Sequence, residues 1–86
     1  MLLQNEITFV ESKMLELSQK HDLQKYANEL KESKEYKDFL TRLSWDILRA
    51  ACGVNYICSL YDKYSANDYH ITTLAKHCIK VLNLNL

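Results

Sequence analysis

Apolar residues recur along the first third of the chain at the spacing of one helix face. From Leu3 to Leu17 the steps alternate between four and three residues, which predicts an amphipathic helix over about residues 3–20. Its apolar members are Leu3, Ile7, Val10, Met14 and Leu17. His21-Asp22 interrupts this spacing, and Asp is a favoured residue type at helix N-caps. We therefore expect Asp22 to cap a short second helix that ends near Lys31, with Leu23, Tyr26, Ala27 and Leu30 on one side.

The longest apolar pattern covers residues 34–64 and predicts one long central helix, which Ser33 would cap. Its main seam consists of Tyr36, Leu40, Leu43, Ile47, Ala50, Val54, Ile57, Tyr61 and Tyr64. A second stripe lies on the opposite side and leaves a narrow polar edge with Ser44, Asn55 and Asp62. A helix that is apolar on two sides is normally buried between neighbours. Gly53 either lets a neighbouring backbone or ring approach closely, which we favour, or divides the helix in two.

The strongest turn signal is Ser65-Ala66-Asn67-Asp68, because Ser, Asn and Asp compete with helical backbone hydrogen bonds. A last helix should follow over about residues 68–82. Its inward residues would be Ile71, Leu74, Cys78, Val81 and Leu82. The sequence therefore predicts an all-α fold, a small helical bundle of three principal helices plus one short helix. We expect residues 1–86 to form a single helical domain around the long helix of residues 34–64.

The charge of the chain is balanced, with eleven basic residues, eleven acidic residues and a formal net charge of +0. The basic field that attracts nucleic acids or anionic membranes is therefore absent at chain level, and self-association meets no net repulsion. The longest uncharged run, residues 50–61, is too short for a membrane span, and the first residues do not resemble a secretory signal. We accordingly expect a cytoplasmic protein. Nine lysines against two arginines are typical of an AT-rich gene, such as one from a phage, a plasmid or a low-GC bacterium.

Cysteine and histidine are the residue types most able to carry chemistry here. The three cysteines, Cys52, Cys58 and Cys78, lie in apolar helical surroundings, which predicts buried, reduced thiols. His70 and His77 are seven residues apart, about 10 Å along a helix, and the spacing of the cysteines does not match a zinc knuckle. We therefore expect no metal site and no cofactor. Because no phosphate loop, nucleophile elbow or close carboxylate pair is present in the sequence, we also expect no enzymatic activity.

The C-terminal helix leaves a nucleic-acid-binding alternative open. Residues 68–77 resemble the start of a helix-turn-helix, in which a polar cap precedes the pattern I-x-x-L-A. A turn and a recognition helix should follow in that motif, whereas residues 78–82 continue the same helix. Lys76, His77 and Lys80 form only a small basic cluster. A small regulator that binds nucleic acid through this helix is therefore the alternative that we favour less.

The second stripe of the long helix carries residue types that often dominate the energetics of protein interfaces. Trp45, Arg49, Cys52 and Tyr56 recur at helical spacing, and Leu60 continues the stripe. Arg49 lies one turn from Trp45, close enough to place its guanidinium over the indole ring. This stripe either contacts a partner or packs against the first helix of the same chain.

A second concentration of aromatic residues lies near the end of the long helix. Tyr61, Tyr64 and Tyr69 each combine an apolar ring with a polar hydroxyl, which suits either an interface or the closed end of a bundle. Together the two patterns predict a small non-catalytic regulator, inhibitor or adaptor that binds a protein or a second copy of itself. A homodimeric structural module is a further alternative. The expected contact residues are Trp45, Arg49, Tyr56, Leu60, Tyr61, Tyr64 and Tyr69.

Overall fold

A computed structural model describes residues 3–33, 38–65 and 68–86 of the chain, and five helices lie in these segments. They are α1 (Gln4–Lys20), α2 (Leu23–Glu32), α3 (Phe39–Cys52), α4 (Val54–Lys63) and α5 (Asp68–Val81). No strand occurs among the described residues, which confirms the predicted all-α class. Tyr36 of the predicted seam and Ala66 and Asn67 of the predicted turn lie outside the described residues.

Helices α1, α2 and α5 begin and end within one residue of their predicted bounds. At the start of α1, the Glu6 carboxylate accepts a hydrogen bond from the Leu3 N–H group at 3.0 Å. At the start of α2, the predicted cap is confirmed, because the Asp22 carboxylate accepts from the Lys25 N–H group at 2.9 Å. Both contacts satisfy backbone donors that have no partner inside the first turn of a helix.

The predicted long helix of residues 34–64 is wrong, because the chain changes direction at Gly53. This residue has φ 85° and ψ 156°, a conformation that residues with a side chain rarely adopt, and it separates α3 from α4. The predicted cap is also wrong. Ser33 ends α2, whereas Asp38 caps α3 by accepting from the Thr41 N–H group at 3.1 Å.

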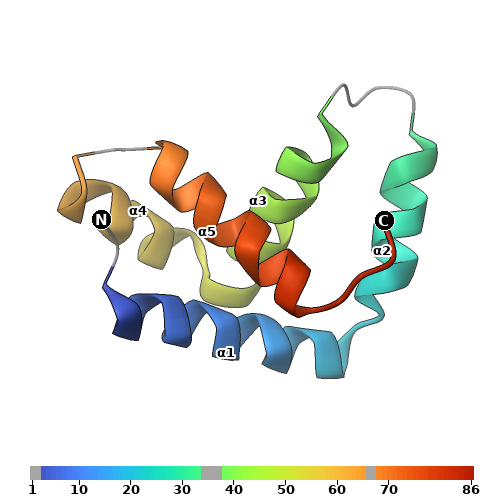
Figure 1. The fold of residues 1–86 in the computed structure, drawn as a ribbon, viewed down its shortest axis with the longest axis horizontal. Helices are drawn as coiled ribbons and strands as arrows, with labels where there is room; N and C mark the ends of the chain where they lie inside the picture. Colours follow the sequence, from blue (N-terminus) through green and yellow to red (C-terminus); the bar gives the residue numbers. More distant parts are fainter. Residues whose placement is uncertain (1–2, 34–37, 66–67) are drawn as a thin grey trace.

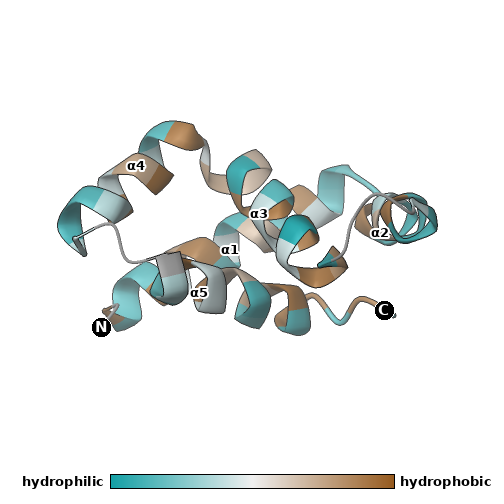
Figure 2. Ribbon diagram, turned by 90° about the horizontal axis from the view of Figure 1, so that it is seen from above, coloured by the Kyte–Doolittle hydropathy of each residue, from teal (hydrophilic) through white to brown (hydrophobic). Residues whose placement is uncertain are grey.

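The packing is organised around α3, which contacts each of the other four helices. Helix α3 packs against both α1 and α5, and α1 also packs against α5. In Figure 1, α1 runs along one edge, α5 passes across α3, and α4 and α2 lie at opposite ends of the molecule. Figure 2 views α2 nearly end-on, so this short helix stands steeply to the others. Each helix in that view carries both hydrophilic and hydrophobic residues, as expected for elements with one face toward a core.

The core draws on all five helices. Its buried hydrophobic residues are Val10, Met14, Leu23, Ala27, Leu30, Leu43, Ile47, Leu48, Ile57, Leu60, Ile71, Leu74, Ala75, Cys78 and Ile79. Part of the predicted seam is not among them, because the turn at Gly53 leaves Val54 61% exposed, and Leu40 and Ala50 also face outward. Ser44, which we expected on the polar edge, is fully buried, and its hydroxyl donates to the Leu40 carbonyl at 2.7 Å. The predicted inward residue Val81 is exposed at the end of α5.

Candidate functional site

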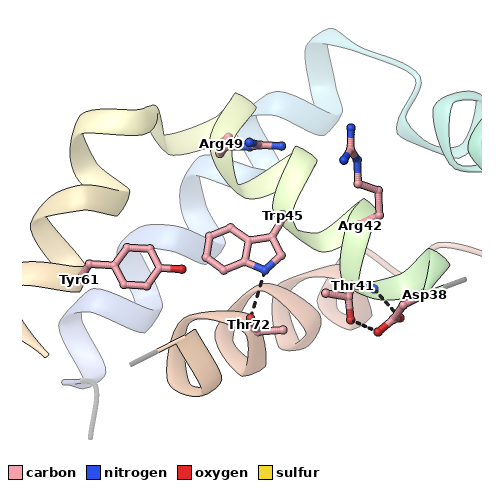
Figure 3. A pocket seen from close by; sticks show the side chains of 7 residues that line it. All are labelled: Asp38, Thr41, Arg42, Trp45, Arg49, Tyr61 and Thr72. Carbon is pink, nitrogen blue, oxygen red and sulfur yellow. Dashed lines mark hydrogen bonds between the residues drawn. The ribbon is translucent and has the colours of Figure 1, made fainter. Parts of the chain in front are cut away.

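Trp45 lies where α3, α4 and α5 meet. Its indole N–H group donates to the Thr72 hydroxyl of α5 at 3.1 Å. The ring of Tyr61 in α4 is nearly parallel to the indole, with 3° between the planes and 6.0 Å between the centroids. Figure 3 shows the two rings side by side, with the Tyr61 hydroxyl directed toward Trp45. The hydrogen bond fixes the rotation of the indole, so these two half-buried rings present a defined aromatic surface.

A groove of about 600 Å³ surrounds these rings. It is lined by Asp38, Thr41, Arg42, Trp45, Arg49, Tyr61 and Thr72. Figure 3 shows Arg49 above the indole, Arg42 further along α3, and Asp38 and Thr41 at the N-terminal end of α3. Asp38 accepts hydrogen bonds from the hydroxyl and the N–H group of Thr41, and these bonds, with the charge of Lys76, lower the pKa of its carboxyl group.

Asp46, which does not itself line the groove, is hydrogen-bonded to both arginines. Its carboxylate accepts from Arg49 Nη2 at 2.7 Å, from Arg42 Nε at 3.2 Å and from the Tyr26 hydroxyl at 2.6 Å. Desolvation raises the pKa of Asp46, but the hydrogen bonds from Tyr26, Arg49 and Arg42 outweigh it, so the pKa lies below its usual value. The Asp46 side chain is 15% exposed, whereas each arginine side chain is 48% exposed. The negative charge therefore lies inward and the positive charges lie outward.

The predicted stripe on the long helix does not form one surface. Arg49 extends to Asp46, so the expected placement of its guanidinium over the indole is replaced by this ion pair. Tyr56 lies against Phe9 of α1, with 4.9 Å between the ring centroids, while Trp45 contacts α4 and α5. Leu60 is 2% exposed and belongs to the core, which removes it from the candidate surface. The turn at Gly53 causes this separation, since it rotates α4 away from the line of α3.

The three tyrosines predicted to lie together near the end of the long helix also occupy different places. Tyr61 joins Trp45, whereas Tyr64 donates a hydrogen bond to Glu6 and thereby closes the end of the molecule between α1 and α4. Tyr69 is 73% exposed and has its ring 5.8 Å from that of His70. Of the seven predicted contact residues, the structure thus brings Trp45, Arg49 and Tyr61 together in one groove.

Several residues in or next to the groove were not predicted from the sequence. Arg42 stands three residues before Trp45, so the same helical spacing that selected Arg49 could have found it. Asp46 follows Trp45 directly and is linked to both arginines at three and four residues, a spacing typical of helical ion pairs. Thr72 has no such signal, because its place beside Trp45 depends on how α5 crosses α3.

The cysteines and histidines are the remaining residues that the sequence marked as able to carry chemistry. Within those residues, no group of three or more His, Cys, Asp and Glu side chains is placed to hold a metal ion. His77 Nε2 lies 2.7 Å from Glu11 Oε1, which links α5 to α1. Burial raises the pKa of Cys52 to about 11 and that of Cys78 to about 12, which suppresses their thiolates. Cys58 is exposed, so the prediction that all three thiols are buried is wrong for this residue.

Among the described helices, none has the length and hydropathy that crossing a membrane would require. No family model matches the sequence, and neither a curated protein nor a solved structure matches it.

Proposed function

We propose that this chain is a small non-catalytic binding protein, a regulator, inhibitor or adaptor, that holds a protein partner in the groove between α3, α4 and α5. The observation that carries this proposal is the aromatic pair of Trp45 and Tyr61 with the exposed arginines Arg42 and Arg49 beside it. Trp, Tyr and Arg are the residue types most enriched among those that dominate interface energetics.

The construction of the groove supports the same function. Trp45 is fixed by Thr72 and both arginines are fixed by Asp46, so few side chains lose further freedom when a partner binds. The groove is open and offers rings and guanidinium donors, which are contact groups for a protein surface. The lining residues include one carboxylate, that of Asp38, and it is held at a helix start by Thr41.

A site-specific photo-crosslinker tests this proposal. Tyr69 is exposed and lies one helical turn before Thr72, so benzoylphenylalanine in its place samples the rim of the groove with little change of shape. Phe9, 41% exposed on α1, is the matched control position. In cells that express the protein natively, we expect position 69 to give an adduct with one defined protein and position 9 to give none.

The captured protein must then bind again in purified form. We expect a stoichiometric complex that Arg49→Ala weakens by about tenfold or more, whereas Lys25→Ala on α2 leaves it unchanged, with helicity verified for both variants. An adduct between two copies of this chain would replace the proposal by a homodimeric module, and an adduct with nucleic acid would replace it by the alternative regulator. The absence of any adduct at position 69 would contradict the proposal.

A further inference from the structure

We propose that the tail (residues 83–86), which follows α5, is a strap that positions the groove through α2. The tail binds α2, and α2 holds Tyr26 against Asp46, the carboxylate to which both groove arginines are bonded. This inference rests on the proposed function and adds a regulation of the same site, in which docking of the tail and binding of a partner strengthen each other. A continuous series of contacts from the tail to the groove carries it.

The tail reaches α2 because the chain turns sharply after α5. Asn83 has φ 57°, and its N–H group donates to the Lys80 carbonyl at 3.0 Å. Asn is one of the few residue types other than Gly that adopt this left-handed conformation readily, and it often ends a helix in this way. Leu84, which follows, is half-buried against the core. Figure 1 shows the tail in red as it passes from α5 to the side of α2.

Two side chains of α2 hold the tail by its backbone. The Asn85 N–H group donates to Gln24 Oε1 at 2.7 Å, and Gln24 Nε2 donates to the Asn85 carbonyl at 2.9 Å. Lys31 Nζ donates to the Leu86 carbonyl at 2.7 Å. Gln24 stands near the start of α2 and Lys31 near its end, and among the helices α2 packs chiefly against α3. The tail therefore ties both ends of a short helix to α5.

The same helix reaches the groove through Tyr26. Its hydroxyl donates to Asp46 Oδ2 at 2.6 Å, and Arg42 Nε donates to the same oxygen at 3.2 Å. The other carboxylate oxygen, Oδ1, accepts from Arg49 Nη2 at 2.7 Å. A helix moves as a stiff element, so a shift of α2 draws Tyr26 away from Asp46. The carboxylate then loses a partner that fixes its orientation, and Arg49 is held less firmly.

The docked and the released tail are the two states of this device. Each hydrogen bond between the tail and α2 is exposed to water, and such bonds are individually weak. A segment held in this way opens locally without unfolding the rest of the molecule. A partner that binds the positioned arginines favours the docked state, and the docked state favours the partner by the same factor.

The chain has only two arginines, so their side-chain NMR signals report on the groove alone. Arg42→Lys assigns the two signals, and hydrogen exchange of the Arg49 guanidinium is the readout. Asn83→Val should release the tail, because a β-branched residue disfavours positive φ, and should accelerate this exchange by about fivefold. Asn83→Gly keeps the backbone conformation and is the matched control. Exchange of the Asn85 N–H group verifies that the tail is released.

Changes on α2 test the same route from the other side. Gln24→Ala should accelerate Arg49 exchange, whereas Asn28→Ala should not, because it removes only the bond that Gln24 Nε2 donates to Asn28 Oδ1 at 3.0 Å. Deleting residues 84–86 removes every contact between the tail and α2, whatever conformation Asn83 adopts. In Tyr26→Phe the exchange should already be fast, and the deletion should accelerate it no further.

Three results would overturn this inference. The first is unchanged Arg49 exchange in the deletion variant. The second is an equal acceleration in Glu6→Gln, which removes a contact between α1 and α4 and would indicate a general loosening of the fold. The third is an effect of the deletion that persists in Tyr26→Phe, because the route through α2 would then be excluded.

Failure here is distinct from failure of the proposed function. The exchange measurement needs no partner, so an active strap without any crosslinked protein would contradict the function alone. A crosslinked protein that binds the intact chain and the deletion variant equally would retain the function and exclude the coupling. We expect instead that the deletion weakens its binding by about fivefold and that the bound protein slows exchange of the Asn85 N–H group.

Discussion

Ile47 in α3 is 1% exposed, whereas Val54 at the start of α4 is 61% exposed. Truncating Ile47 to Ala removes buried methyl groups and leaves a cavity, so the free energy of unfolding should fall by about 2–5 kcal/mol. Truncating Val54 to Ala should change it by no more than about 0.5 kcal/mol, because the side chain faces outward. Urea unfolding of both variants measures the difference. A similar loss in the two variants would contradict the exposure of Val54 at the start of α4.

The three thiols should react at clearly different rates. Cys78 is buried with a pKa raised to about 12, and Cys52 is half-buried with a pKa raised to about 11. Cys58 is exposed on α4. A chromogenic disulfide reagent at neutral pH should therefore modify one thiol rapidly and the other two slowly, and Cys58→Ser should remove the fast phase. A fast phase that survives in Cys58→Ser would contradict the described burial of the other two thiols.

At the scale of the helices, Gly53 determines where the chain turns. A Cβ atom at this position would meet nothing within 4 Å, so the obstacle to a side chain is the backbone conformation and not crowding. Gly53→Ala and Gly53→Ser should therefore each cost about 1–3 kcal/mol of unfolding free energy, with little dependence on side-chain size. Thermal and urea unfolding measure this cost. Stabilisation with a gain in helicity would instead indicate that α3 and α4 fuse into the single helix that the apolar pattern predicts.

Local signals explain which elements the sequence could predict. The apolar spacing in α1 and α5 is a signal that acts within a few residues, and so is the capping carboxylate of Asp22. The ends of these three helices could therefore be predicted from the pattern alone. The break at Gly53 depends on a backbone angle that apolar spacing does not encode, since the seam continues in register on both sides. The same limit applies to the site, since only residues that share a helix can be grouped from their spacing. Trp45 and Arg49 share one helix, whereas Tyr61 reaches the groove only after the turn at Gly53, and Thr72 only through the way α5 crosses α3.

At the scale of the whole molecule, polar contacts join the helices around the apolar core. Glu6 of α1 accepts from Lys63 at 3.2 Å and from Tyr64, which ties the far end of α4 to the start of α1. The Gln24 side chain exchanges two hydrogen bonds with the backbone of Asn85, at 2.9 and 2.7 Å, and Figure 1 shows the C-terminus beside α2. These contacts connect residues that are far apart in sequence, so they act on the assembled fold and not on single helices.

The carboxylates of Glu6 and Asp46 should make the fold sensitive to acid. Burial raises the pKa of Glu6, but hydrogen bonds from Tyr64, the Leu3 N–H group and Lys63 outweigh it and lower the pKa below its usual value, and the pKa of Asp46 is likewise lowered. In acid the unfolded chain therefore binds more protons than the folded chain. The stability that each group contributes is fully present above its unfolded pKa and is lost as the pH falls through its lower folded pKa. Urea unfolding between neutral pH and about pH 3 should show this loss.

Glu6→Gln and Asp46→Asn should each lower stability at neutral pH and flatten its decline in acid, because the titrating group is gone. Glu29→Gln, which removes an exposed carboxyl on α2, is the control and should leave the slope close to that of the unmodified protein. Loss of the Asp46 charge should also release Arg42 and Arg49, so Asp46→Asn should weaken binding in the groove. Glu6 lies in α1 and contacts the far end of α4, so Glu6→Gln should change stability alone. Equal slopes in all four proteins would contradict the assignment of acid sensitivity to these two contacts.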